Sequence, residues 1–190
     1  MLFRSEIRQV ALQTAEAEAQ ILEYGAVVRD LKVRRRDGGL QRVVLGLNSV
    51  EDYVAHAPHF GAIAGRYANR IRGGRFELDG VAYQLPLNQD GRHALHGGGS
   101  TGFGKIPWVL VHNDDASATL VHVSPDGTNG YPGTLTMTAR YRLVGATLRI
   151  ELAASTGKAT VVNVCHHSYF NLDGSADILD HTLEIGRAHV

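Results

Sequence analysis

The sequence predicts an all-β protein whose antiparallel strands form a sandwich or a barrel. Three observations point to this fold class. Apolar and polar residues alternate with a period of two in several short runs, turn residues join these runs in pairs, and the 22 glycines concentrate between the runs. Because the chain shows no internal repeat, low-complexity tract or linker, we expect one domain with one core.

The first third of the chain contains the only stretches with helical character. Residues 51–56 and the few residues near Ala68 look briefly helical. The basic run at residues 32–36 lies beside an Asp-Gly-Gly turn, so we expect it to form a solvated loop edge.

The clearest hairpin covers residues 76–85. Its two apolar runs are separated by Asp79 and Gly80, and an Asp-Gly pair tolerates the positive φ angles of a two-residue type I′ turn. Residues 109–112 and 119–123 form a second candidate hairpin, joined across residues 113–115.

The strongest alternation lies between residues 135 and 143, where apolar side chains occupy every second position. After Gly145 and Ala146 the alternation resumes through residue 152, so these two runs are predicted to pair as a third hairpin. A further apolar run, residues 159–164, is predicted to be a strand that leads directly into two adjacent histidines.

Composition excludes several classes of function. The chain has 190 residues, of which 44% are hydrophobic and 20% charged, as in an ordinary globular domain. Lys plus Arg equals Asp plus Glu at 19 each, so the overall charge gives no sign of binding to nucleic acid or an acidic membrane. No stretch approaches the roughly 18 apolar residues of a membrane helix.

Cysteine usage and the N-terminal residues predict the compartment. Cys165 is the only cysteine, which excludes an intrachain disulfide and suits a reducing environment. The first twenty residues contain no uninterrupted apolar segment of the kind found in signal peptides. We therefore expect a cytoplasmic protein that binds neither membrane nor nucleic acid.

Two groups of histidines stand out among the ten in the chain. His93 and His96 precede three glycines, 97–99, whereas His166 and His167 follow the apolar run. Neighbouring residues of a strand point to opposite faces, so only one of His166 and His167 can face a given site. A histidine beside a strand is more often a packing residue than a catalyst, and this alternative stays open.

Metal and cofactor sites are not predicted. Neither the His-x-x-His spacing at residues 93–96 nor the adjacent pair at 166–167 fits a familiar zinc pattern, which needs three or four ligands. The chain also lacks a glycine-rich phosphate loop ending in Lys-Ser or Lys-Thr, and it lacks a Gly-x-Ser-x-Gly nucleophile elbow. Nucleotide transfer and serine hydrolysis are therefore not expected.

Six motifs in order resemble the aldose 1-epimerases, or galactose mutarotases. They are GRYANRI at 65–71, FELDGVAYQLPLN at 76–88, LHGG at 95–98, Gly-Phe followed by Trp108, DGTNGYPG at 126–133 and HSYFNL at 167–172. The resemblance extends from about Tyr24 to Ile185. It implies a large antiparallel β-sandwich, the supersandwich, and the interconversion of the α and β anomers of free aldohexoses by a monomer or homodimer without cofactor or metal.

The resemblance also assigns roles to residues. His167 matches the proton donor, and an imidazole with a pKa of about 6.5 suits that role. His96 matches the histidine that hydrogen-bonds the sugar near its ring oxygen, and Asn69 and Arg70 match the sugar-contacting pair. In addition, Ser168 and Tyr169 are expected at the pocket wall, with a core position for Tyr169 equally open, and glycines 97–99 are expected to allow a tight backbone path beside the sugar.

Other residues of these motifs are expected to play supporting parts. Arg66 and Tyr67 are read as packing groups that brace their loop. Where the family commonly has Asn, the chain has His166, which places an extra titratable group behind the acid. Where the family commonly has Asp, the chain has Gly104, which is expected to loosen its loop.

The end of the chain departs from the family. The resemblance covers little more than the first half of a family member, so residues 1–185 are expected to be the N-terminal portion of one sandwich domain. Residues 186–190 are expected to be a non-native tail. The family's general base lies in the portion that is not matched, and Asp90, Asp173 and Asp177 match no catalytic position. A chain of this extent is therefore expected to leave sheet edges and inner apolar surface uncovered and to be inactive.

Two alternative functions remain open. A relative acting on hexose 6-phosphates would need extra Arg or Lys at the pocket, whereas the unbroken ANR and HSYFNL motifs favour free sugars. A non-catalytic carbohydrate-binding β-domain would need no paired acid and base, and the joint presence of His96 and His167 argues against it for a complete protein.

Overall fold

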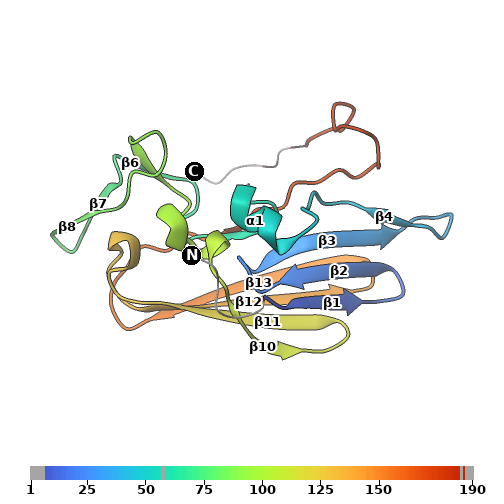
Figure 1. Cartoon of the computed structure of the whole chain (residues 1–190), viewed down its shortest axis with the longest axis horizontal. Coiled ribbons are helices and arrows are strands. Elements are labelled where there is room, and N and C mark those ends of the chain that lie inside the picture. Colours follow the sequence, from blue (N-terminus) through green and yellow to red (C-terminus); the bar gives the residue numbers. More distant parts are fainter. Residues whose placement is uncertain (1–6, 57–58, 185, 187–190) are drawn as a thin grey trace.

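The computed structural model describes residues 7–56, 59–184 and 186, and strands dominate these residues (Figure 1). Two antiparallel sheets of four strands each run alongside one another, with strand orders β1-β2-β3-β4 and β10-β11-β12-β13. The strands of the first sheet are β1 Gln9–Gln13, β2 Ala17–Leu22, β3 Val27–Arg34 and β4 Leu40–Arg42. Those of the second sheet are β10 Val109–Asn113, β11 Ser117–Ser124, β12 Leu135–Val144 and β13 Thr147–Thr156. The all-β prediction is therefore confirmed.

Short elements connect the sheets and form one end of the molecule. Three two-stranded sheets pair β14 with β5, β6 with β9 and β7 with β8, and the last two lie away from the main sheets in Figure 1. Their bounds are β5 Ile63–Ala64, β6 Arg70–Arg72, β7 Arg75–Leu78, β8 Val81–Gln84, β9 His93–Leu95 and β14 Cys165–His166. The short helices are α1 Val50–His56 and the 3-10 turns η1 Gly99–Thr101, η2 Phe103–Lys105 and η3 Thr128–Gly130.

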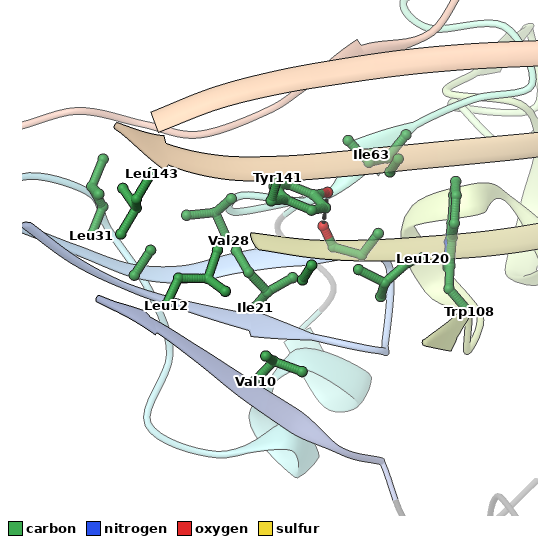
Figure 2. Close-up of a cluster of buried hydrophobic side chains, with 14 of the residues drawn as sticks. Val10, Leu12, Ile21, Val28, Leu31, Ile63, Trp108, Leu120, Tyr141 and Leu143 are labelled. Atoms are coloured by element: carbon green, nitrogen blue, oxygen red, sulfur yellow. Dashed lines mark hydrogen bonds between the residues drawn. The ribbon is translucent and has the colours of Figure 1, made fainter. Parts of the chain in front are cut away.

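One hydrophobic core joins the two large sheets. Along β12, alternate side chains from Leu135 to Leu143 are buried, as the period of two predicts. They pack with side chains of the first sheet such as Ile21 and Val28 (Figure 2). Full burial of side chains of this kind contributes about 1.5–3 kcal/mol each. Tyr141 is fully buried, and its hydroxyl donates a hydrogen bond to the carbonyl of Ala26, so the two layers are also joined by a polar contact.

Local sequence explains α1, the one α-helix among the described residues. Ser49 precedes α1, and its hydroxyl oxygen accepts the backbone N–H of Asp52 at 3.1 Å, which is an N-cap bond. Glu51 and Asp52 place negative charge in the first turn, where the helix dipole favours it. Tyr53 anchors the helix in a small apolar cluster beside the main core. The described residues contain no helix that is both long and apolar enough to cross a membrane.

The predicted hairpins and helix are confirmed. β7 and β8 pair across Asp79 and Gly80, which have φ angles of 53° and 76° as a type I′ turn requires. β10 pairs with β11, and β12 pairs with β13. The basic run is only partly a loop edge, because Lys32 and Arg34 lie within β3 and the remaining arginines follow it.

Two predicted elements are wrong. The residues near Ala68 are not helical, because the Ala68 N–H donates to the carbonyl of Asn163 and the segment runs extended beside that residue. Residues 159–164 are not a strand, since Asn163 makes the only bridge there and no neighbouring strand supplies a ladder. The strand at this place is β14, which begins after Val164.

The expected uncovered surface is present at β13. Within the described residues β13 is the last strand of its sheet, and its inward side chains Leu148, Ile150 and Leu152 are only partly buried. Two other predictions involve residues that the structure does not describe. The expected tail at 186–190 is described only at Gly186, and the expected absence of a signal peptide involves six residues, 1–6, that the structure does not describe.

Candidate active site

The GRYANRI segment is held in place by the buried guanidinium of Arg66, which is 2% exposed. Its Nη1 donates to the carbonyls of Pro132 and Gly133 at 2.9 and 2.8 Å, and its Nη2 donates to the hydroxyl of Ser124 at 2.8 Å. The guanidinium carbon also lies 5.4 Å from the centre of the Tyr131 ring. The prediction that Arg66 braces its loop is therefore confirmed.

Asn69 and His96 are joined by a reciprocal pair of hydrogen bonds. The backbone N–H of Asn69 donates to Nδ1 of His96 at 3.1 Å, and the backbone N–H of His96 donates to the carbonyl of Asn69 at 3.0 Å. Both residues have positive φ angles, 61° and 50°. Because Nδ1 accepts a hydrogen bond, the proton of a neutral His96 lies on Nε2, which leaves that nitrogen as a donor.

Arg70 begins β6, which pairs with β9 directly before His96. Its Nε donates to Oε1 of Gln89 at 2.6 Å, and its Nη1 donates to Oδ1 of Asn69 at 3.1 Å. Both Asn69 and Arg70 are exposed. The side chains of this pair are therefore fixed by each other and by Gln89 while they remain accessible to a ligand.

Three imidazole rings meet beside this pair. The ring centres of His96 and His167 lie 5.1 Å apart, and His59 lies 4.7 Å from His96 and 5.9 Å from His167. His167 follows β14 and is anchored by its backbone, because its N–H donates to the carbonyl of Ala62 at 2.9 Å. Tyr169 also packs against His167, with 5.3 Å between ring centres.

Burial and nearby positive charge keep the His59 and His96 rings neutral. Burial, together with the neighbouring His96, Lys105 and His167, lowers the pKa of His59 to about 4. Burial also lowers the pKa of His96, together with His167, Arg70 and Lys105. Neither His59 nor His96 carries a proton charge at neutral pH, so each is available as a neutral hydrogen-bonding ring.

His166 and Ser168 lie on the opposite side of their segment from His167. The hydroxyl of Ser168 lies 3.1 Å from Nε2 of His166, and both residues line a separate cavity of about 350 Å³ whose walls are otherwise apolar. Burial lowers the pKa of His166 to about 4. The structure thus brings Tyr169 to the histidine cluster but does not bring Ser168 there.

The glycines after His96 allow two loops to touch. A Cβ atom on Gly97, whose φ is 85°, would lie 1.9 Å from the carbonyl oxygen of Gly65. The amide of Asn129 donates to the carbonyls of Gly97 and Gly98 at 3.0 and 2.6 Å, which ties the DGTNGYPG loop to the same place. The predicted tight backbone path is confirmed, whereas its position beside a sugar stays a prediction.

Sequence reasoning missed His59 and Lys105. His59 stands outside both histidine groups chosen from the sequence, and its partners lie far along the chain. Gly104 was expected to loosen its loop, but the structure contradicts this, because a Cβ there would lie 3.1 Å from the Cβ of Ala62 and 3.2 Å from Nδ1 of His59. The cluster is therefore tightly packed on the side of η2.

The chemistry available here is hydrogen bonding and proton transfer. Imidazole, amide and guanidinium groups converge on one accessible place, and each can bond to hydroxyl groups. Within the part of the chain that the structure describes, no group of three or more His, Cys, Asp or Glu side chains is arranged to hold a metal ion.

Comparisons with known proteins agree on one family. The family model described as aldose 1-epimerase matches residues 8–189. Galactose mutarotase from Rattus norvegicus is 40% identical over 183 residues, which are 94% of this chain and 52% of the relative. The chain therefore spans about half the length of the curated relatives it matches.

Solved structures give the same result. An aldose epimerase homologue from C. elegans has a TM-score of 0.84 and 27% identity, covering 90% of this chain and 52% of that one. Galactose 1-epimerase from Lactobacillus acidophilus has a TM-score of 0.79 and 33% identity, covering 92% of this chain and 51% of that one.

Loss of Arg66 should mainly destabilise the fold. Arg66→Ala leaves several buried carbonyls without a donor, so we expect the free energy of unfolding to fall by about 2–4 kcal/mol. Urea denaturation measures this change. Arg75→Ala, on the exposed face of β7, is the matched control and should change stability by no more than about 0.5 kcal/mol. Equal effects of the two substitutions would contradict the bracing role.

The free energy of unfolding should decrease as pH falls from about 6.5 to about 4. The pKa values of His59 and His166 are lowered to about 4 in the folded state, so the unfolded chain binds protons first as pH falls from about 6.5. The stabilisation is fully present above pH ~6.5 and is lost by pH ~4. Urea denaturation across this range should show a shallower pH dependence in His166→Asn, and an unchanged slope would show that His166 is not buried as a neutral ring.

Proposed function

Since the chain belongs to the aldose 1-epimerase family, we propose that this site binds a free aldohexose such as galactose or glucose and supplies the acid for its anomer interconversion. One observation carries the proposal. The rings of His96 and His167 lie 5.1 Å apart beside the linked side chains of Asn69 and Arg70. This spacing lets both rings and the polar pair approach one small polyol.

Recognition of the sugar rests on fixed hydrogen-bonding groups. A hexose presents several hydroxyls, each able to donate and accept, and a site with pre-positioned donors loses little entropy on binding them. Asn69 and Arg70 are already held by their mutual bond and by Gln89. His96 adds an Nε2–H donor whose direction is fixed by the bond at Nδ1. Tyr169 provides a wall beside His167.

Anomer interconversion requires proton transfer at two atoms. A base removes the proton of the anomeric hydroxyl while an acid protonates the ring oxygen, the bond from C1 to that oxygen breaks, and the open aldehyde forms. Rotation about the C1–C2 bond followed by closure gives the other anomer. We assign the acid role to His167 and the stabilisation of the ring oxygen to the Nε2–H of His96. An acid of this type contributes about 10²–10⁴-fold to the rate.

The general base is not identified among the described residues. The charges that act on His59 and His96 belong to Lys105, Arg70 and other histidines, and no described carboxylate is among them. Asp173 and Asp177 are engaged in their own turn, where they accept bonds from Ser175 and from the Leu179 N–H. The proposal for this chain is therefore sugar binding and the acid half of the reaction.

A phosphorylated hexose is a second candidate ligand. The positive charges of Lys105 and Arg70 both act on His96, and two cations at one pocket favour an anionic group on the sugar. In both cases the partner is a small-molecule sugar. A cytoplasmic location and a monomeric or homodimeric state remain predictions from the sequence.

Arg70 should contribute to sugar binding more than to stability. Hydrogen bonds to charged groups contribute about 1.5–3 kcal/mol, so Arg70→Ala should weaken D-galactose binding roughly tenfold or more. Titration calorimetry or NMR titration with D-galactose measures this. Arg72→Ala, at the other end of the same strand, is the control and should bind normally. If both variants bind alike, Arg70 is not a sugar ligand, and tighter binding of a hexose 6-phosphate than of the free sugar would favour the second candidate.

The chain alone should not accelerate mutarotation. It offers the proposed acid, but water is a poor replacement for a positioned base. Polarimetry on freshly dissolved α-D-galactose, with a full-length galactose mutarotase as positive control, should give the rate of the buffer blank. A faster rate that His167→Ala abolishes would show that a base is present within these 190 residues.

A further inference from the structure

We propose that His59 is a positioning residue of the sugar site, whose imidazole packs against His96 and His167 and fixes the distance and angle between their rings. The proposal rests on the proposed function of this site. The His59 ring lies 4.7 Å from His96 and 5.9 Å from His167, so the three rings form a triangle, and each comes from a different segment of the chain. Removal of His59 would take away the one aromatic ring that contacts both His96 and His167 among the ring contacts of the described residues.

Packing, rather than hydrogen bonding, holds the His59 ring. Its Nδ1 is buried and has no hydrogen-bond partner among the described residues. A buried polar atom without a hydrogen-bond partner lowers the stability of the fold. The presence of an imidazole at this position therefore points to a role other than stability. The backbone around it is constrained as well, because His59 has a φ of 59° and its carbonyl accepts the Ala62 N–H at 3.1 Å.

The neighbouring turn leaves space that this ring fills. A Cβ on Gly104 would lie 3.2 Å from Nδ1 of His59, closer than ordinary van der Waals contact. A larger residue at position 104 would therefore press on the ring. The match between a bare backbone at Gly104 and the buried edge of His59 indicates that this wall of the cluster is built around the imidazole.

The charge of the surroundings gives the positioning a chemical consequence. His59 is faced by His96 and His167, and the charge of Lys105 on η2 also acts on it. The charge of Arg70 also acts on His96. Because burial and these positive groups keep His59 uncharged at neutral pH, it can pack against His96 and His167 without competing for the transferred proton.

The test follows histidine imidazole signals by NMR in the full chain over a pH titration. The wild type should show ring-to-ring cross-peaks from His59 to His96 and His167. In His59→Ala, the titration midpoint of His96 should move toward the ordinary value of about 6.5, because water replaces the lost ring. D-galactose binding should weaken by about tenfold, as expected for one misplaced hydrogen bond. His59→Phe keeps an aromatic ring at this position, so it should restore both the titration midpoint of His96 and the affinity for D-galactose.

Two further variants keep the test decisive. Gly104→Ala presses on the His59 ring without altering any histidine and should shift the signals of His96 and His167. His122→Phe, which replaces a partly buried imidazole packed between Phe103 and Trp108, is the control and should leave them unchanged. Missing cross-peaks in the wild type, unchanged midpoints in His59→Ala, or an equal effect of His122→Phe would overturn the proposal. These signals need no sugar, so absence of galactose binding by the wild type would count against the proposed function alone.

Discussion

The candidate site depends on one buried cation. The guanidinium of Arg66 bonds to carbonyls on the loop that carries Ser124, Pro132 and Gly133, and it thereby fixes the segment on which Asn69 and Arg70 lie. Burying a charge is unfavourable unless it is well hydrogen-bonded, and here the two terminal nitrogens of Arg66 donate to several carbonyl and hydroxyl oxygens, whereas its Nε has no partner among the described residues. The positions of the exposed Asn69 and Arg70 therefore depend on Arg66, which is buried and cannot itself contact a ligand.

Hydrogen bonds that involve the backbone connect the segment held by Arg66 to the histidine cluster. Asn69 is bonded to His96 in both directions, and the loop of His96 is in turn bonded to Asn129. His167 reaches the same place from a different sheet, through the pairing of β14 with β5. The cluster is therefore held from two sides, and burial together with nearby positive groups keeps His59 and His96 neutral. Such an arrangement suits a site that moves a proton to and from an uncharged ligand.

The features that depend on local sequence were predictable, and the long-range ones were not. Alternation along β12 and the Asp79-Gly80 turn specify strands and hairpins with no knowledge of their partners. The run at 159–164 has strand-like composition, but no strand lies beside it to pair with, and composition cannot show that. Within the site, the period of two separates His166 from His167 and also places Ser168 with His166, an implication that the resemblance to a family motif obscured. His59 could not be found from spacing, because only the fold brings it to His96.

The central claim is that His96 and His167 flank one bound aldohexose. The most direct measurement is the NMR detection of contacts between protons of bound D-galactose and the imidazole protons of both residues, in the wild-type chain and in Arg70→Ala. The account predicts contacts to both rings that disappear when Arg70 is removed, while the rings of His112 and His122 show none. Galactose contacts that avoid the cluster, or that involve only one of the two rings, would contradict it.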